Sequence, residues 1–148
     1  MRTLSSTIDI DASPDVVWAV LTDQEAFPDW NPFVTRFAGD LVLGGRLEVR
    51  IAPPGGRGMT FRPTVTALEP QRRLEWLGRL LLPGVFDGRH SFELTELPDG
   101  GTRLAQSESF SGLLVRASGG MLNSTLDGFE AMNKAVKLRA ETVAVAAA

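Results

Sequence analysis

The residues in this sequence best suited to acid–base chemistry are its single histidine and a glutamate on the next predicted strand. In the first strand, alternation of side chains places His90 on the same face as Phe86 and Phe92. In the second strand, Gln106 and Glu108 share a face with apolar residues. An unpaired polar group in a core costs about 1–3 kcal/mol. Three inward polar side chains on adjacent strands therefore predict a cavity rather than a solid core.

The turn between these two strands decides whether the histidine and the glutamate face each other. A turn over residues 97–101 places His90 opposite Glu108, with Cβ atoms about 4.5–5.5 Å apart. A tighter three-residue turn would shift the register and place Phe110 opposite His90 instead. A facing pair is either an acid–base or ligand-anchoring pair or a satisfied structural pair. Gln106 is either a third ligand-orienting group or the hydrogen-bond partner of His90.

The elements that position these residues follow from the hydrophobic pattern. Alternation predicts a half-buried strand over residues 3–12, and Pro14 begins the first of two short helices. Over residues 33–112 the period is two and turn residues recur, which is typical of an antiparallel meander. Within this region, Pro63 marks a bulge or a sheet edge. From Met121 an apolar stripe with helical spacing predicts a final helix long enough to cross a sheet.

Composition narrows the class of protein. The 148 residues are enough for a real core, and we expect one domain over residues 1–148. The net charge is −3 and the basic residues are scattered, which argues against a nucleic-acid partner. The chain has no cysteine and one histidine, so we expect no metal site and no cofactor, although a carboxylate-only site stays open. No apolar run approaches the ~20 residues that span a bilayer, and no secretory signal is present, so we expect a cytoplasmic protein.

Five short motifs carry a family resemblance that covers nearly the whole chain. They are Ser13-Pro14-x-x-Val17-Trp18, Trp30-Asn31-Pro32-Phe33, Arg73-Leu74-Glu75-Trp76, His90-x-Phe92-x-Leu94 and Gly128-Phe129-x-x-Met132-Asn133. Their order and spacing resemble the START-like (SRPBCC) superfamily, and within it the polyketide cyclase/dehydrase-like branch. The resemblance implies an α+β helix-grip fold, with a curved seven-stranded antiparallel sheet around the long C-terminal helix and a deep ligand cavity between them. Because the superfamily holds carriers, receptors, cyclases, ring-hydroxylase domains and chaperone activators, the fold does not fix the activity.

The resemblance also implies which side chains contact a ligand. Most are large inward residues of the strands and the final helix: Phe33, Phe61, Trp76, Leu80, His90, Phe92, Glu108, Phe110, Leu122, Leu126 and Phe129. Gln106 joins them because it also points inward, and Trp30 stands with Phe33 beside a turn at the expected cavity mouth. The chain shows no iron or iron–sulfur ligand set and no tyrosine. Ring-hydroxylase chemistry and any mechanism that depends on a phenol hydroxyl are therefore set aside.

Three functions follow, in order of preference. The first is binding of a small hydrophobic molecule, lipid-like or aromatic, oriented by His90, Gln106 and Glu108. The second is a cyclase or dehydratase in which His90 is the general base and Glu108 its orienting or acid partner. The third is an interaction module, which would need a large exposed apolar patch, whereas the outward strand faces are polar. The oligomeric state stays open, with a homodimer among the alternatives.

Overall fold

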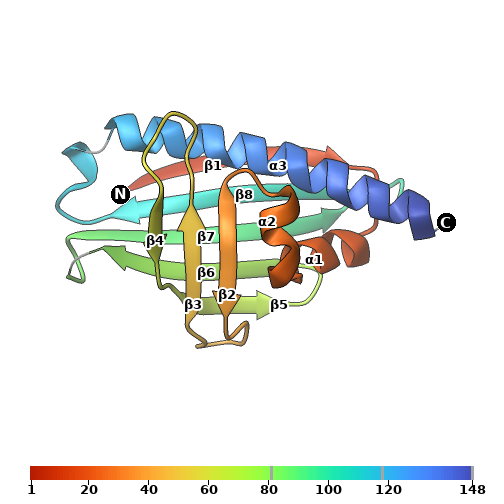
Figure 1. Cartoon of the computed structure of the whole chain (residues 1–148), viewed down its shortest axis with the longest axis horizontal. Helices are drawn as coiled ribbons and strands as arrows, with labels where there is room; N and C mark the ends of the chain where they lie inside the picture. The colour runs from red at the N-terminus through yellow and green to blue at the C-terminus, as the bar shows by residue number, and fades with distance from the viewer. Residues whose placement is uncertain (81, 118, 148) are drawn as a thin grey trace.

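Two antiparallel sheets and a long C-terminal helix make up the fold (Figure 1). The computed structural model describes residues 1–80, 82–117 and 119–147. In these residues the strands are β1 (Arg2–Ile10), β2 (Val34–Gly39), β3 (Leu47–Ile51), β4 (Met59–Phe61), β5 (Thr64–Glu69), β6 (Arg73–Leu80), β7 (Phe86–Glu96) and β8 (Thr102–Ser111). The helices are α1 (Pro14–Thr22), α2 (Phe27–Trp30) and α3 (Gly119–Ala147), with short 3-10 helices η1 (Gln24–Ala26) and η2 (Val115–Ala117). The prediction of an α+β chain with two short helices near the N-terminus and a long final helix is confirmed.

The strands that were expected as one sheet of seven form two sheets. The larger has the order β1-β8-β7-β6-β5 and the smaller has the order β2-β3-β4. The division falls at Pro63, which separates β4 from β5 because proline has no N–H for a strand ladder. β4 pairs with β3, whereas β5 pairs with β6, so the chain passes from one sheet to the other at this residue. An isolated bridge between Arg46 and Thr64 connects the two sheets.

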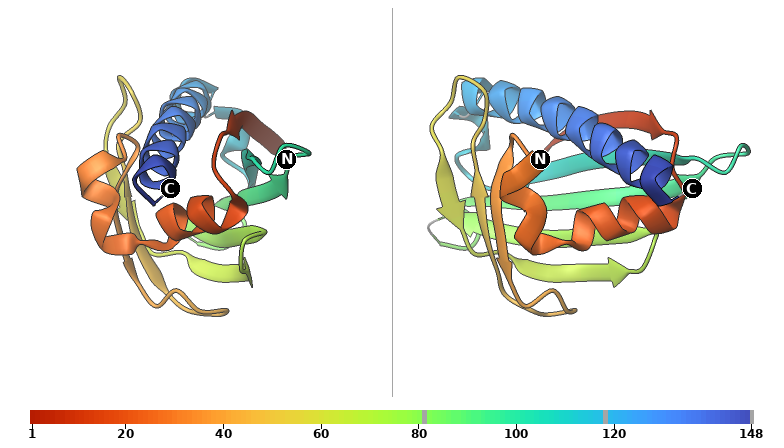
Figure 2. Two further views of the ribbon diagram at one scale, coloured as in Figure 1. Left: turned by 90° about the vertical axis from the view of Figure 1, so that its right-hand side faces the viewer. Right: turned by 45° about the vertical axis from the view of Figure 1, so that its right-hand side comes forward.

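α3 closes one side of the space between the two sheets (Figure 2). Its buried face follows the predicted apolar stripe and consists of Leu122, Thr125, Gly128, Phe129, Met132, Asn133, Val136 and Ala140. Gly128 allows the ring of Phe33 to lie against the helix backbone, because a Cβ atom there would come within 2.3 Å of the ring. The Phe33 and Phe129 rings then meet edge to face, with centroids 5.7 Å apart. Among the described residues, no helix is both long and apolar enough to cross a membrane.

Candidate functional site

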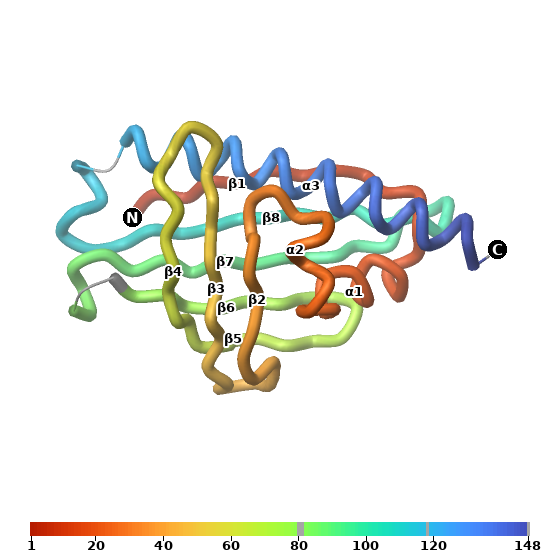
Figure 3. The backbone as a smooth tube through the Cα atoms, in the orientation of Figure 1, coloured from red at the N-terminus to blue at the C-terminus, as the bar shows by residue number. Residues whose placement is uncertain are grey.

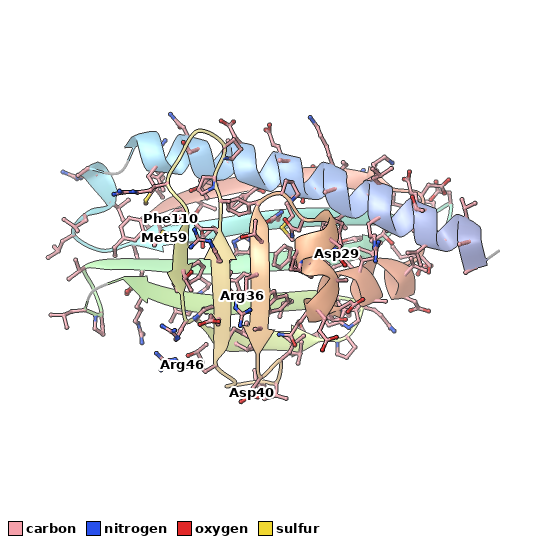
Figure 4. The ribbon with its side chains drawn as sticks, viewed as in Figure 1. Asp29, Arg36, Asp40, Arg46, Met59 and Phe110 are labelled. Atoms are coloured by element: carbon pink, nitrogen blue, oxygen red, sulfur yellow. The ribbon has the colours of Figure 1, made fainter. Side chains whose placement is uncertain are left out.

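A cavity of about 480 Å³ lies at the end of the larger sheet where α3 begins. This volume is within the range of about 300–1,000 Å³ that small-molecule sites occupy. The lining residues come from the end of β3 and the connection after it, from β4, from β6, β7 and β8, and from the first turns of α3: Ile51, Pro53, Gly56, Arg57, Gly58, Met59, Phe61, Gly78, Arg79, Phe86, Gly88, Glu108, Phe110, Gly120, Met121, Ser124 and Thr125. Figure 4 shows two of them, Met59 and Phe110, at the end of the molecule where α3 starts. The wall is mostly apolar, with one carboxylate in it.

The cavity exists because two inward positions that face each other carry no side chain. Gly78 of β6 pairs with Gly88 of β7 in the register of the sheet. A Cβ atom at Gly78 would lie 3.1 Å from Cδ2 of Phe61, and one at Gly88 would lie 3.2 Å from Oε1 of Glu108. Any larger side chain at either position would have to enter the cavity or displace these neighbours. The glycine pair therefore forms the floor of the cavity.

Of the two registers that the sequence left open between β7 and β8, the structure has the one with the turn over residues 97–101. The turn closes with hydrogen bonds from the backbone N–H of Leu97 to the carbonyl of Gly101 (2.8 Å) and from that of Gly100 to the carbonyl of Leu97 (2.9 Å). His90 consequently lies directly opposite Glu108. The Nδ1 atom of His90 is 3.6 Å from Oε1 of Glu108. The carboxylate side chain is 12% exposed and lines the cavity, so it is the polar group through which a bound molecule would reach the histidine.

His90 itself lies behind the cavity wall, in an aromatic enclosure. Its ring stacks on Trp76, with centroids 5.1 Å apart and an interplanar angle of 18°. Phe129 of α3 meets the ring edge to face at 4.9 Å, and Phe92 lies at 4.7 Å. These rings leave the histidine 3% exposed. The ring therefore has a fixed orientation and no open path to solvent.

A chain of hydrogen bonds fixes which nitrogen of the histidine carries a proton. The Nε2 amide of Gln106 donates to Oδ1 of Asn133 at 2.9 Å and approaches the backbone carbonyl of Phe129 at 3.5 Å. Both of these partners are acceptors in this arrangement, since the Asn133 amide donates to the hydroxyl of Ser6 at 3.2 Å. Oε1 of Gln106 must then accept from Nε2 of His90, 2.9 Å away. Nδ1 is thus the nitrogen that faces the glutamate.

This orientation gives the His90–Glu108 pair a definite chemistry. A neutral ring with its proton on Nε2 presents a lone pair at Nδ1, which would repel a charged carboxylate oxygen. At 3.6 Å the two atoms are in close polar contact but beyond hydrogen-bond distance. The arrangement places a carboxylate, which accepts hydrogen bonds when ionised, at the cavity wall with an imidazole nitrogen directly behind it.

The predicted site residues fall into three groups. Phe61, Glu108 and Phe110 line the cavity. A second group is buried behind the wall: Phe33, Trp76, His90, Phe92, Gln106, Leu122 and Phe129. Trp30 and Leu126 are half-buried and pack against the core away from the cavity wall. The side chain of Leu80 lies outside the described part of the structure.

Several lining residues were not anticipated as site residues, notably the two glycines, Met59, Met121 and Arg57. The signal that could have identified the floor is the occurrence of glycine at inward positions of two adjacent strands. In the described part of the chain, no cluster of three or more His, Cys, Asp or Glu side chains is placed to hold a metal ion.

The outer face of the larger sheet holds a separate charged cluster around Glu75. Burial by itself would raise the pKa of this carboxyl, but hydrogen bonds from Arg89, Thr66 and Arg73 outweigh it and lower the pKa below its ordinary value. The Arg89 and Thr66 contacts each measure 2.8 Å. Because this cluster faces away from the cavity, we assign it to stability.

The family described as "Polyketide cyclase / dehydrase and lipid transport" matches this chain over residues 1–141. No curated protein matches the sequence closely enough to be compared. Among solved structures, a START superfamily protein from Mycobacterium smegmatis is 18% identical with a TM-score of 0.76, over 97% of this chain and 99% of that one. A hypothetical protein from Helicobacter pylori is 17% identical with a TM-score of 0.79, over 94% of this chain and 88% of that one.

The di-domain ARO/CYC protein StfQ from the steffimycin biosynthetic pathway is also similar. It is 14% identical with a TM-score of 0.75, and the match covers 97% of this chain and 52% of StfQ. At identities this low, the three likenesses concern the fold alone.

Proposed function

Because this chain belongs to the polyketide cyclase/dehydrase and lipid transport family and has its START-like helix-grip fold, we propose that it binds a small hydrophobic molecule in the cavity over Gly78 and Gly88. The family supports hydrophobic ligand binding in general, and the cavity gives the place. The observation that carries the proposal is a cavity of small-molecule size whose wall is mostly apolar and contains one carboxylate. As part of the proposal, residues 1–148 form one ligand-binding domain that acts in the cytoplasm without a cofactor.

The ligand in this proposal has an apolar body and a hydrogen-bond donor at its inner end. Glu108 is an acceptor when ionised, and Nδ1 of His90 lies 3.6 Å behind its carboxylate. A hydroxyl or an N–H on the ligand would complete the coordination of the carboxylate. Arg57 and Arg79 lie at the outer part of the wall, where a polar or anionic outer end would be tolerated.

The test uses N-phenyl-1-naphthylamine, a fluorescent aromatic amine with one N–H group. We expect its fluorescence to increase on binding to the wild-type protein and its presence to raise the melting temperature. Gly78→Val and Gly88→Val should each weaken binding by about tenfold or more, since their side chains occupy the cavity. Ala105→Val, which also introduces a valine but on the outer face of β8, is the control and should bind as wild type does. Absence of binding by the wild-type protein would refute the proposal.

A second candidate function is supported by the contact between His90 and Glu108. A dehydratase reaction on a β-hydroxy ketone removes a proton from the α-carbon, forms the C=C bond and expels the hydroxyl group, which leaves as water after it takes up a proton. Of the two side chains, Glu108 lines the cavity, so the geometry favours it as the group that touches the substrate, with His90 as its proton partner. This reverses the roles expected from the sequence.

The enzymatic candidate is tested with an aryl β-hydroxy ketone by following the absorbance of the conjugated product. If the pair is catalytic, Glu108→Gln should lower turnover by about 10²–10⁴-fold. Turnover that is absent in the wild type, or that is unchanged in both Glu108→Gln and His90→Ala, would contradict the enzymatic candidate. Ligand binding would then be the only proposed function that remains.

A further inference from the structure

Apolar side chains are exposed around the end of the molecule where the cavity opens. Leu82, in the connection between β6 and β7, is 71% exposed, and Leu113, in the connection between β8 and α3, is 85% exposed. Met121, in the first turn of α3, is 39% exposed and also lines the cavity. Figure 3 shows that both connections and the start of α3 lie at the same end of the chain trace. Leucines this exposed next to a cavity mouth have no packing role in the fold.

Backbone contacts hold the two connections side by side. The N–H of Leu113 donates to the carbonyl of Gly84 at 3.2 Å, and the N–H of Leu114 donates to the carbonyl of Val85 at 3.1 Å. Gly112 makes this approach possible, because its φ is +114° and a Cβ atom there would lie 2.4 Å from the carbonyl oxygen of Val85. The two connections that carry the exposed leucines are therefore joined to each other by backbone hydrogen bonds.

Arginines surround this apolar end. Arg57 and Arg79 line the cavity. Arg116 lies in η2, three residues after Leu113. Arg2 pairs across the sheet with Phe110, a cavity residue. Within the described residues, Arg2, Arg57 and Arg116 form no ion pair, while Arg79 lies 3.9 Å from Asp87. This end is therefore cationic, although the whole chain has a net charge of −3.

We propose that this end, formed by Leu82, Leu113 and Met121 with Arg2, Arg57 and Arg116, docks on an anionic membrane surface. The leucines would enter the boundary between headgroups and acyl chains while the guanidinium groups contact lipid phosphates and other anionic headgroups. A second copy of this chain is a poorer occupant, because a two-fold contact through this end would bring two sets of arginines together. Docking goes beyond ligand binding, and it would place the cavity mouth against the lipid.

The experiment is flotation of the full chain with vesicles of phosphatidylcholine alone and of phosphatidylcholine mixed with phosphatidylglycerol. We expect the anionic vesicles to bind at least about tenfold more protein at low salt, since each basic residue near such a surface strengthens binding by about fivefold. High salt should reduce this preference through screening.

Two matched pairs of variants distinguish the role of this surface from the effect of placing a glutamate at any exposed leucine or arginine. Leu82→Glu combined with Leu113→Glu should abolish flotation, whereas Leu43→Glu, at a 70% exposed leucine between β2 and β3, should leave it unchanged. Arg116→Glu should weaken flotation by about fivefold or more, whereas Arg139→Glu, an exposed position near the other end of α3, should not. Unchanged circular dichroism and melting temperature in each variant establish that it folds.

Three results would overturn the proposal. The first is no preference of the wild type for anionic over neutral vesicles. The second is equal losses in the Leu43 control and the double variant. The third is a dimer that the double variant dissociates, because it would assign this end to a second copy. Binding of N-phenyl-1-naphthylamine by the double variant in the absence of vesicles should remain at the wild-type level, so a failure of docking is distinguishable from a failure of ligand binding.

Discussion

The two halves of the space between the larger sheet and α3 are built from the same strands but differ in content. In the half that we call the filled half, Trp76, His90 and Gln106 point inward. Trp76 stacks on His90, and His90 and Gln106 contact Phe129. In the half that we call the open half, the next inward positions along β6 and β7 are Gly78 and Gly88, and a cavity remains. The difference is produced by side-chain size alone, because the strand pairing is continuous through both halves.

The comparison teaches how this fold combines rigidity with an empty site. The filled half contains buried polar groups, and each member of the chain from His90 to Ser6 has a partner. Such a network keeps its geometry only if the surrounding packing is complete. The open half lacks that packing and depends on a ligand to fill it. Glu108 lies at the boundary between the two halves: it lines the open half, and His90 of the filled half is 3.6 Å from its carboxylate.

The largest effect is expected from removing an aromatic ring in the filled half. Phe129→Ala should lower the free energy of unfolding by about 3–5 kcal/mol, because the ring is fully buried and its loss leaves a void. Phe61→Ala, in the open half, should cost clearly less, since that ring is half-buried and already borders empty space. Chemical denaturation measures both. Equal losses would mean that the two halves are packed alike.

A smaller loss of stability is expected from Gln106→Leu. This change leaves Nε2–H of His90 and Oδ1 of Asn133 without partners, which should cost about 3 kcal/mol. Ser107→Ala, one residue along on the opposite face, removes a hydrogen bond to Ser91 and should cost about 1 kcal/mol or less. Thermal and chemical unfolding measure the loss of stability in each variant. If Gln106→Leu cost no more than Ser107→Ala, the hydrogen-bond network would not be what orders the filled half.

Ligand preference at the boundary should change by about tenfold. The wild type should bind N-phenyl-1-naphthylamine about tenfold more tightly than its N-methyl derivative, because only the former donates a hydrogen bond to Glu108. Glu108→Leu should reduce this ratio to about one. Fluorescence titration gives the ratio independently of any general change in the cavity. A ratio near one in the wild type would show that the carboxylate does not orient the ligand.

The smallest effect is expected on the stability of the fold at acidic pH. The pKa of Glu75 is lowered in the folded state, so its ionised form stabilises the fold at pH values above the ordinary pKa of 4.5. That stabilisation is lost as the pH falls below this value and through the lowered pKa. Glu75→Gln should therefore flatten the acid limb of the stability curve, measured by denaturation at several pH values.

The pairing of His90 with Glu108 could be predicted only as one of two alternatives, because the place of the turn is local information but its length was left open. The Pro98-Asp99-Gly100 segment indicates where the turn lies. The register of both strands depends on the length of the turn, which the structure shows. The alternation of side chains identified Gln106 as an inward residue. What the sequence left open, whether Gln106 orients a ligand or holds the histidine, was resolved by its distance of 2.9 Å to the ring.

The position of the cavity could not be predicted in the same way. Large inward aromatic residues were expected to line it, but such residues fill space, and the cavity lies where they are missing. That Gly78 faces Gly88 depends on the register between β6 and β7, and Pro83-Gly84 indicates the place of the connection but not its length. The passage of the chain between sheets at Pro63 also depends on distant pairing, with β3 on one side and β6 on the other.

The most direct test of the account is a crystal structure of the protein with N-phenyl-1-naphthylamine. We predict that the aromatic rings lie over Gly78 and Gly88, with the amine nitrogen within hydrogen-bond distance of the Glu108 carboxylate. A ligand bound elsewhere, or a cavity closed by the residues that line it, would contradict the central claim that the missing side chains of the open half form the binding site.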